Sequence, residues 1–455
     1  MDHDDLLPEH ALYWVARAIV HNPDAGVIYS DEDKIDQQGA RSAPYFKSDW
    51  NAFLLRSQNM ISHLGVYQRD LVNRVGRFRE GFEGSQDYDL ALRCTEKLSP
   101  AQIIHIPRVL YHWRIHAGST AVASDEKPYA VHAAVKALND HLHRTGRKGE
   151  VELLPFGMYR VHYTLPEPAP LVSLIIPTRN AWALLKQCID SIQRLTTYPR
   201  YEIIVIDNGS DEAESLAYFA QIDQQPDIRV LRDDGPFNYS ALNNRAVSQA
   251  RGELVGLINN DIEVISPDWL DEMVSLALQP GVGAVGARLW FPDDRLQHGG
   301  VVLGIGGIAN HAHKFLPRGE YGYFARAVLI QEFSAVTAAC LVIRKKVFEQ
   351  VGGLDEVNLK IAFNDVDFCL RVQEAGYVNV WTPYAELYHY ESATRGFEDS
   401  PEKQERFNDE VAYMARRWPN IKSDYAYNPN LTLDDVDFGL AWPPRASDWK
   451  GPGLR

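Results

Sequence analysis

Polar side chains follow three apolar runs in the middle of the chain, each at the point where a run ends. In chain order they are Pro177, Thr178, Arg179, Asn180, Asp207, Asn208, Asn260 and Asp261. Amide and carboxylate groups bind polar ligands, and a carboxylate can recruit a divalent cation to a phosphorylated one. If the runs are strands of one parallel sheet, their carboxyl ends meet in a crevice, which is where such sheets bind ligands.

The elements that would position these side chains alternate along the chain. Apolar runs typical of buried strands cover residues 171–176, 202–206, 228–231 and 254–258. Apolar residues spaced by three and four predict helices between these runs, over 184–195, 216–222 and 241–250. The alternation predicts an α/β fold, with a mostly parallel sheet and helices on both of its faces.

Residues 125–170 lie between two parts of the chain and lack the alternation of strands and helices. This segment has a helical pattern over 129–143 and prolines at Pro166, Pro168 and Pro170, which is typical of a helical, proline-rich linker. The predicted domains are a truncated domain at 1–124, a complete α/β domain at 171–420 and a C-terminal extension at 421–455.

A weak internal repeat relates the two parts. The matched segments are 64–78 with 340–354, 87–93 with 365–371, and 110–112 with 387–389. Only the second copy is preceded by the strands that form the crevice. The first copy is therefore predicted to be the C-terminal portion of the same kind of domain, with no catalysis of its own.

Six segments of the second copy carry a resemblance to a known family. They read LVSLIIPTRN, EIIVIDNGSD, FNYSALNNRAVSQARGE, LVGLINNDIEV, FNDVDFCLR and AELYHYESATRG. In this order they resemble the family 2 glycosyltransferases of GT-A fold. The chain looks closest to the bacterial enzymes, rhamnosyltransferase-like members included, that build O-antigen and other cell-surface glycans. The resemblance covers residues 171 to about 418 in full, and 1 to about 120 as an incomplete second copy.

The resemblance implies a nucleotide-sugar site at the strand ends. Asp207 would accept hydrogen bonds from the base or ribose of the donor. Residues 177–180 would form the floor of the nucleotide pocket. The other substrate-binding residues it implies are Asn208, Asn243, Asn244 and Asn260. The alternative for residues 207–210 is a plain turn with its usual residue types.

The resemblance also implies a divalent cation, Mg²⁺ or Mn²⁺, held by Asp261 and His389. A hard cation on carboxylate oxygen neutralises the charge that grows on a diphosphate leaving group, and imidazole is an acceptable ligand for Mn²⁺. Asn259 stands where the family has its first metal-binding aspartate, so the site has one charge fewer. The alternatives are a strand-ending turn for Asp261 and a structural histidine at 389. The repetition of His389 as His112 favours the functional reading.

Asp365 is the catalytic base that the resemblance implies. Transfer with inversion needs one carboxylate to take the proton of the acceptor hydroxyl as that oxygen attacks the anomeric carbon. Asn364 replaces the glutamate that the family has before this aspartate. The alternative is structural, because Asn364 or Asp365 is also a natural N-cap for a helix over 366–375.

These assignments predict an inverting, metal-dependent glycosyltransferase. It would move a sugar from a nucleotide-diphosphate-sugar donor to a glycan or lipid-linked acceptor in cell-surface polysaccharide synthesis. The two asparagine replacements and the incomplete first copy keep a second reading open, a non-catalytic carbohydrate-binding or assembly module. A nucleotidyltransferase that forms sugar nucleotides is disfavoured, because residues 177–180 lack the glycine-rich basic loop such enzymes place after the first strand.

Composition limits the partners and the compartment. The 455 residues carry a formal net charge of −15, which repels nucleic-acid phosphates, so no nucleic-acid partner is expected. Four widely spaced cysteines in apolar runs and an acidic start without a signal peptide predict a cytoplasmic protein with reduced, buried thiols. Peripheral association with the inner membrane stays open through the amphipathic end at 416–418. Residues 296–313, rich in glycine and histidine, are predicted to form a flexible acceptor-side loop.

Overall fold

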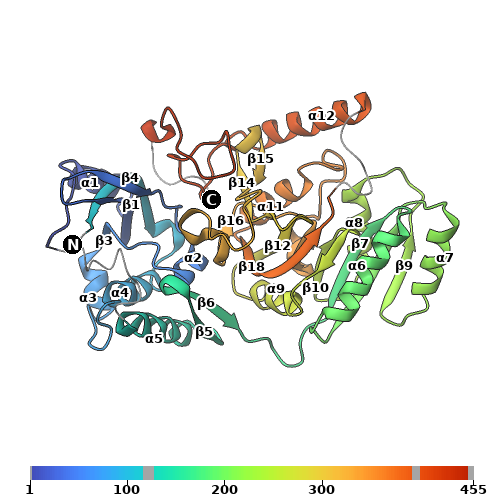
Figure 1. The fold of residues 1–455 in the computed structure, drawn as a ribbon, viewed down its shortest axis with the longest axis horizontal. Helices are drawn as coiled ribbons and strands as arrows, with labels where there is room; N and C mark the ends of the chain where they lie inside the picture. Colours follow the sequence, from blue (N-terminus) through green and yellow to red (C-terminus); the bar gives the residue numbers. More distant parts are fainter. Residues whose placement is uncertain (1–2, 116–127, 392–399, 449–455) are drawn as a thin grey trace.

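The computed structural model describes residues 3–115, 128–391 and 400–448 (Figure 1). A small sheet with its own helices lies at one end of the molecule, and a large sheet carries the rest of the chain. The domain boundary predicted between residues 124 and 125 lies outside the described residues, as do residues 392–396 of the AELYHYESATRG segment.

The large sheet has the strand order β11-β18-β12-β17-β10-β7-β8-β9, with β13 beside β12 and β16 beside β18. These strands are β7 (Val172–Thr178), β8 (Tyr201–Asp207), β9 (Ile228–Arg232), β10 (Leu254–Ile258), β11 (Ile262–Val264), β12 (Val282–Trp290), β13 (Leu296–His298), β16 (Gln331–Phe333), β17 (Cys340–Arg344) and β18 (Val378–His389). β7 to β10 run parallel, as do β12 and β18, whereas β17 is antiparallel to both of its neighbours. The predicted α/β class is confirmed, but the sheet is mixed: β11, β13, β16 and β17 pair antiparallel with their neighbours.

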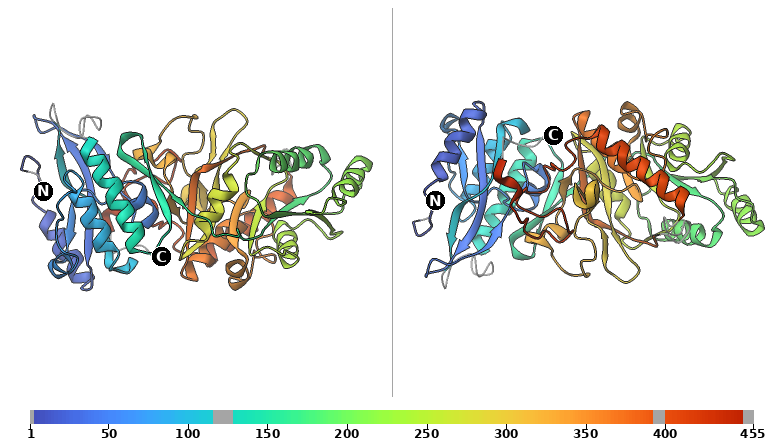
Figure 2. Two further views of the ribbon diagram at one scale, coloured as in Figure 1. Left: turned by 90° about the horizontal axis from the view of Figure 1, so that it is seen from below. Right: turned by 90° about the horizontal axis from the view of Figure 1, so that it is seen from above.

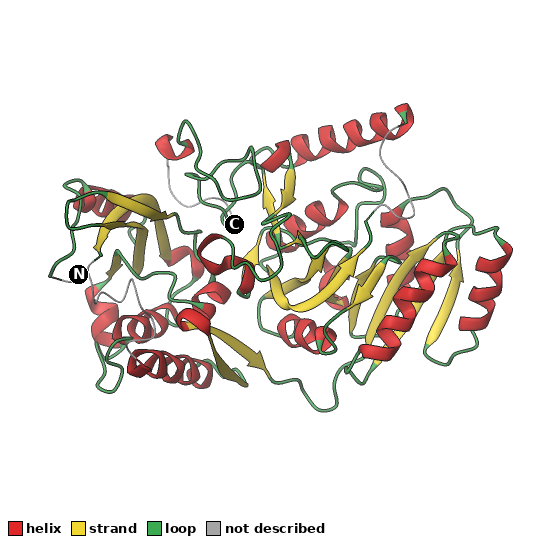
Figure 3. Cartoon of the chain, in the orientation of Figure 1, coloured by secondary structure: helices red, strands yellow, loops and turns green. Residues whose placement is uncertain are grey.

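Helices cover both faces of this sheet (Figure 3). On one face lie α6 (Trp182–Leu195), α7 (Ala213–Ile222) and α9 (Trp269–Ala277). On the other lie α8 (Tyr239–Ser248), α10 (Lys345–Gln350), α11 (Asn364–Glu374) and α12 (Pro401–Arg417). Strand side chains alternate between the faces, so Leu174 and Ile176 pack with the first set and Ile175 with the second. Because both faces are covered, the strands read as unbroken apolar runs, and this is why the sequence predicts them well.

The first part of the chain repeats this pattern on a smaller scale. Its elements are α1 (Ala11–His21), β1 (Val27–Ile35), β2 (Arg41–Tyr45), α2 (Ala52–Ser57), β3 (Gly65–Tyr67), α3 (Arg69–Arg74), α4 (Gln86–Thr95) and β4 (Ile103–Arg114). β1 pairs parallel with β4 and antiparallel with β3, just as β12 pairs with β18 and β17. The repeat in the sequence therefore corresponds to a repeated strand arrangement.

The segment between the two parts is packed against both of them (Figure 2). It holds α5 (Pro128–Arg144) and a hairpin of β5 (Gly149–Leu154) and β6 (Met158–Tyr163). α5 lies against α4, where Ser85 Oγ donates to the carbonyl of Ala130 at 2.7 Å, and β6 contacts α2 and α9. Across the described ranges, no helix combines the length and the apolar character needed to cross a bilayer.

The structure differs from the sequence analysis at the glycine- and histidine-rich segment. Instead of a flexible loop, residues 296–311 contain β13 and a hairpin of β14 (Val301–Leu303) and β15 (Ala309–His311). His298 is fully buried and Gln297 is 2% exposed. The prediction was wrong because glycines here allow the close backbone approaches of a packed hairpin: a Cβ at Gly300 would lie 2.2 Å from the Phe333 ring. The four cysteines are buried and free, as predicted.

A buried ion network in the small sheet gives a pH-dependent contribution to stability. His105 Nε2 lies 2.8 Å from Asp31 Oδ1, and its Nδ1 lies 3.0 Å from Asp49 Oδ1. Burial lowers the pKa of His105, but the Asp31 and Asp49 carboxylates outweigh it and raise that pKa to about 9. The charged imidazole therefore stabilises the folded state fully below about pH 6.5, and this stabilisation is lost as the pH rises through 9.

We expect His105→Gln to remove this dependence. The difference in unfolding free energy between wild type and variant should be larger at pH 6.5 than at pH 9.5, by roughly 3 kcal/mol. Urea unfolding at the two pH values measures it. A difference that stays constant with pH would contradict a protonated His105 in the folded protein.

Candidate active site

The polar strand ends predicted from the sequence lie along one edge of the large sheet. Thr178 is the last residue of β7, opposite Asp207 at the end of β8 in the parallel register. Asn208 donates its backbone N–H to the Thr178 carbonyl at 2.8 Å, and Asn260 Nδ2 donates to Thr178 Oγ1 at 3.0 Å. Thr178 thus connects the ends of β7, β8 and β10, where polar groups can meet a ligand.

Asp207 is buried at the centre of this edge. Its Oδ1 accepts the backbone N–H of Ser210 at 2.9 Å, and its Oδ2 is 2.5 Å from the Arg232 guanidinium. The turn predicted as the alternative for residues 207–210 is therefore present, and both carboxylate oxygens of Asp207 are bonded within the protein. Arg232 occupies one oxygen of that carboxylate in this structure, a pairing that the sequence analysis did not foresee.

The rest of the predicted nucleotide floor surrounds Asp207. Pro177 is buried in β7 and Arg179 is exposed. Asn180, with φ of 51°, accepts the N–H groups at the start of the 211–212 segment on its Oδ1, at 3.0 and 3.2 Å. Asn208 Nδ2 donates to the carbonyl of Gly235 at 2.9 Å. Asn180 and Asn208 therefore shape the loops beside Asp207.

The two asparagines of α8 have different surroundings. Asn243 is fully buried and donates to the Tyr239 carbonyl at 2.8 Å. Asn244 lies away from the strand edge: its amide exchanges hydrogen bonds with the backbone of Leu354 at 2.9 Å and donates to Glu356 Oε2 at 3.0 Å. It lines an open cavity of about 610 Å³ between α8 and the loop after α10. The structure thus buries Asn243 with its amide bonded to its own helix and places Asn244 away from the strand edge.

Asp261 and His389 meet at the end of β10 and β18. Asp261 Oδ1 lies 3.2 Å from His389 Nε2, and both residues are at most 8% exposed. Their strands hold them together, because Ile262 in β11 pairs antiparallel with His389 in β18. Asn259 Nδ2 also lies 3.2 Å from His389 Nε2. A buried carboxylate and an imidazole nitrogen therefore face the same point, beside the strand-end crevice.

This donor set fits a divalent cation as two of its protein ligands. Carboxylate oxygen suits Mg²⁺ and Mn²⁺, and imidazole nitrogen suits Mn²⁺. Within the described ranges, no group of three or more His, Cys, Asp and Glu side chains stands close enough to form a complete set. A cation at Asp261 and His389 would thus take further ligands from a bound diphosphate or from water.

Asp365 lies in the first turn of α11, at the same edge of the sheet. The helix begins after Phe363, whose φ is 57°, so neither Asn364 nor Asp365 is the N-cap that the structural alternative assumed. Asp365 Oδ2 accepts the backbone N–H of Ala338 at 3.1 Å. Burial raises the pKa of Asp365, although hydrogen bonds from Ala338, Thr337 and Val366 lower it in part. A raised pKa suits a general base that works near neutral pH.

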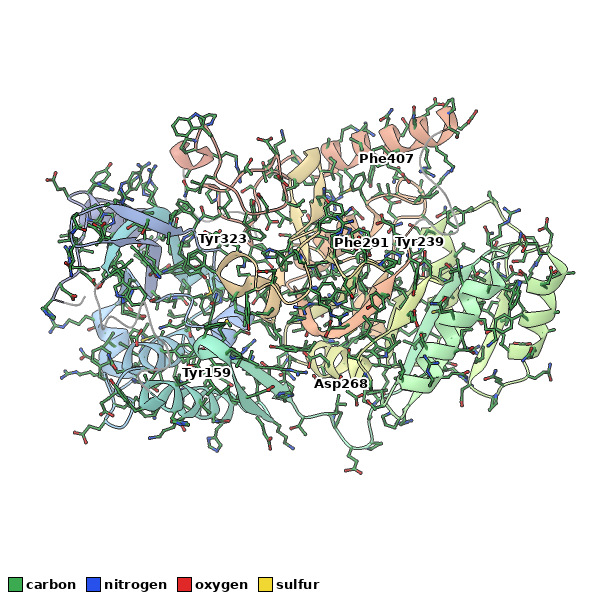
Figure 4. The ribbon with its side chains drawn as sticks, viewed as in Figure 1. Tyr159, Tyr239, Asp268, Phe291, Tyr323 and Phe407 are labelled. Carbon is green, nitrogen blue, oxygen red and sulfur yellow. The ribbon has the colours of Figure 1, made fainter. Side chains whose placement is uncertain are left out.

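Tyr239, which is labelled in Figure 4, connects the two halves of this constellation. Its hydroxyl lies 3.2 Å from Asn259 Oδ1 and 3.0 Å from the carbonyl of Ala338. Asn259 contacts His389, and Ala338 donates to Asp365, so a short chain of contacts joins Asp261 and His389 to Asp365. The three residues with predicted chemical roles are therefore neighbours along one edge and do not lie on different surfaces.

Sequence reasoning missed two residues of this constellation, Tyr239 and Gln297. Gln297 Oε1 lies 2.6 Å from His389 Nδ1. The sequence signal for Tyr239 was its place at the start of a predicted helix beside the crevice. Gln297 gave no signal, because its segment was interpreted as a mobile loop.

The fold and the site define an α/β domain with polar strand ends along one edge of its sheet and an acid–imidazole pair beside them. Comparison with known proteins gives the family. Residues 173–352 match the family "Glycosyl transferase family 2". This match over residues 173–352 agrees with the resemblance to family 2 glycosyltransferases seen in the sequence.

Two curated relatives match nearly the whole chain. An uncharacterized protein of Sinorhizobium fredii is 55% identical over 97% of this chain. The O-antigen biosynthesis protein RfbC of Myxococcus xanthus is 41% identical over 97% of this chain. The chain spans 49% of the first protein and 34% of the second.

A third relative matches about half of the chain. An N-acetylglucosaminyl-diphospho-decaprenol L-rhamnosyltransferase of Mycobacterium tuberculosis is 26% identical over 47% of this chain and 73% of its own length. Among solved structures, a mannosyltransferase of Pyrobaculum calidifontis in complex with GDP-Man and Mn²⁺ is 18% identical. That match covers 54% of this chain and 64% of the other, with a TM-score of 0.40.

Proposed function

We propose that this protein is an inverting, metal-dependent glycosyltransferase that uses a nucleotide-diphosphate-sugar donor. Its acceptor would be a glycan or a lipid-linked glycan in cell-surface polysaccharide synthesis. One observation carries the proposal: the Asp261–His389 pair and the buried Asp365 share the edge of a family 2 glycosyltransferase sheet, joined through Tyr239. The similarity to an O-antigen biosynthesis protein and to a rhamnosyltransferase supports this class of product.

The proposed reaction uses this chain's residues in separate roles. Asp207 and its neighbours bind the nucleoside, and Asp261 with His389 would hold the cation. The cation supplies positive charge to the diphosphate as it leaves. Asp365 accepts the proton of the acceptor hydroxyl while that oxygen forms a bond to the anomeric carbon. The bond from that carbon to the diphosphate breaks, and its electron pair leaves with the diphosphate. Attack opposite the leaving group inverts the anomeric configuration.

Domain organisation forms part of the proposal. Residues 171–420 would be the catalytic domain, and residues 1–124 a non-catalytic copy of its C-terminal portion. The repeated pairing of β1 with β3 and β4 supports this division. The first copy has His112 in place of His389, with its Nδ1 bound to Asp33 Oδ1 at 2.5 Å.

The nucleotide-binding role of Asp207 can be separated from structural roles at the same crevice. We expect Asp207→Ala to weaken binding of the matching nucleoside diphosphate, chosen from UDP, GDP and dTDP, by about 10- to 100-fold. This is the effect of losing a hydrogen bond to a charged group. Isothermal titration measures it. The matched control is Asn244→Ala, which removes contacts to the 354–356 loop and should lower the melting temperature without changing nucleotide affinity. Equal losses of affinity in both variants would contradict the role of Asp207.

A non-catalytic carbohydrate-binding or assembly module is the second candidate, because Asn259 and Asn364 stand where the family has acidic residues. Asn364 donates to the carbonyl of Ile361 at 2.8 Å, which is a structural contact. Release of nucleoside diphosphate from a sugar nucleotide distinguishes the two candidates. A binding module would retain carbohydrate affinity but release none.

A further inference from the structure

Gln297 lies behind the proposed cation site, in β13, with 2% of its surface exposed. We propose that Gln297 is the positioning residue for His389: its amide fixes the imidazole in the tautomer that leaves Nε2 free to bind a cation beside Asp261. This inference rests on the proposed function, because it assumes that Asp261 and His389 bind a cation together. It concerns a residue that contacts no substrate and acts only through His389.

The contacts of the Gln297 side chain determine which way its amide points. One end lies 3.4 Å from the carbonyl of His389 and 3.2 Å from Glu391 Oε2. Both of these partners only accept hydrogen bonds, so this end must be the NH₂ group. The other end is therefore the carbonyl oxygen Oε1, which lies 2.6 Å from His389 Nδ1.

A carbonyl oxygen can only accept, so His389 Nδ1 must carry the hydrogen. In neutral imidazole the other nitrogen, Nε2, then has the lone pair. That nitrogen faces Asp261 Oδ1 and the Asn259 amide, both at 3.2 Å. Metal-binding histidines commonly donate their second nitrogen to an oxygen in this way, which fixes both ring orientation and tautomer. Gln297 thus provides the contact that a cation-binding His389 requires.

The first copy of the repeat shows the same arrangement with another residue. His112 Nδ1 lies 2.5 Å from Asp33 Oδ1, which comes from β1. An oxygen acceptor on Nδ1 is therefore present on the repeated histidine in both copies, although the residue that supplies it differs.

The neighbour of Gln297 points to the opposite side of β13, as successive strand residues do. His298 Nε2 accepts the backbone N–H of Thr337 at 3.4 Å, on the side of Asp365. A change at Gln297 should consequently alter the cation site and leave the proposed base in place. This separation allows the inference to be tested without losing Asp365.

The test compares Gln297→Met, which removes the acceptor, with Gln297→Glu, which keeps one. The tautomer of His389 is read in metal-free protein by NMR of ¹⁵N-labelled histidine rings, with the signal identified by its loss in His389→Ala. Mn²⁺ affinity is read from the paramagnetic resonance of the free ion. We expect Nδ1–H imidazole in wild type and in Gln297→Glu. In Gln297→Met we expect loss of this preference and Mn²⁺ binding that is about 10- to 100-fold weaker.

The control is Gln331→Met, which replaces another buried glutamine whose contacts are to Arg326 and Leu329. It should leave both readouts unchanged. An Nε2–H tautomer in wild type would overturn the inference even if Gln297→Met failed to fold. Wild-type Mn²⁺ affinity in a folded Gln297→Met variant would also overturn the inference. If His389→Ala binds Mn²⁺ only weakly in the same experiment, the proposed cation site still stands. Mn²⁺ binding unaffected by His389→Ala would instead overturn the cation site itself.

Discussion

Asp365→Asn should abolish measurable sugar transfer while donor binding stays at the wild-type level. An amide oxygen can still accept the Ala338 N–H, so the local structure should persist, but an amide cannot take a proton from the acceptor. Removing a general base typically costs about 10²- to 10⁴-fold in rate. Rates of nucleoside diphosphate release with acceptor present, together with the donor dissociation constant, measure the two effects.

The pH dependence of the wild-type reaction provides a second check on Asp365. Because burial raises its pKa, the rate should fall as the pH decreases through a value above the ordinary aspartate pKa of 3.8. Asp365→Asn should lack this acidic limb in any residual activity. Equal loss of donor binding and transfer in Asp365→Asn would remove the assignment of this residue as the base and favour a structural role.

Asp261→Ala should eliminate metal-dependent turnover. In the described part of the chain, Asp261 is the only residue with a carboxylate oxygen within 3.2 Å of the His389 imidazole. Its loss therefore leaves His389 as the one protein ligand. We expect release of nucleoside diphosphate to fall to the level seen with EDTA. The loss of metal affinity should exceed roughly 10- to 100-fold, which is the typical loss when a residue that only hydrogen-bonds a metal ligand is replaced. Assays at increasing Mn²⁺ concentration measure both quantities.

His389→Ala is the companion variant. It should also lower Mn²⁺ affinity, but the retained carboxylate should let high Mn²⁺ restore part of the turnover. His298→Ala removes a neighbouring imidazole without touching Asp261, so it should not change the Mn²⁺ dependence. Turnover that resists EDTA and survives in Asp261→Ala would contradict a cation at this position.

The sequence predicted the parallel strands β7, β8 and β10 well because they are buried on both faces. Apolar runs such as 171–176 and 254–258 need no long-range information to be seen. The polar residues after them, Thr178 and Asp207, followed from a general rule for parallel sheets, and the structure places them together at one edge. The apolar runs predicted the strands, and the rule for parallel sheets predicted where the polar residues after them would lie.

Other features depend on contacts between distant segments, and no local pattern indicates them. Asn243 and Asn244 are adjacent in sequence, yet the Asn243 amide bonds to the backbone of its own helix and the Asn244 amide to Leu354. Arg232 pairs with Asp207 only because β9 lies beside β8. Gln297 reaches His389 from β13, a short strand beside glycines that resembled a loop.

The central claim is that a cation at Asp261 and His389 binds the diphosphate of a nucleotide. Isothermal titration of UDP, GDP and dTDP with and without Mn²⁺, in wild type and Asp261→Ala, tests it most directly. The claim predicts that at least one nucleotide binds wild type only when Mn²⁺ is present, and that Asp261→Ala loses this binding while Asp365→Asn keeps it. Binding of none of the three nucleotides with Mn²⁺, or equal binding to wild type and Asp261→Ala, would contradict it.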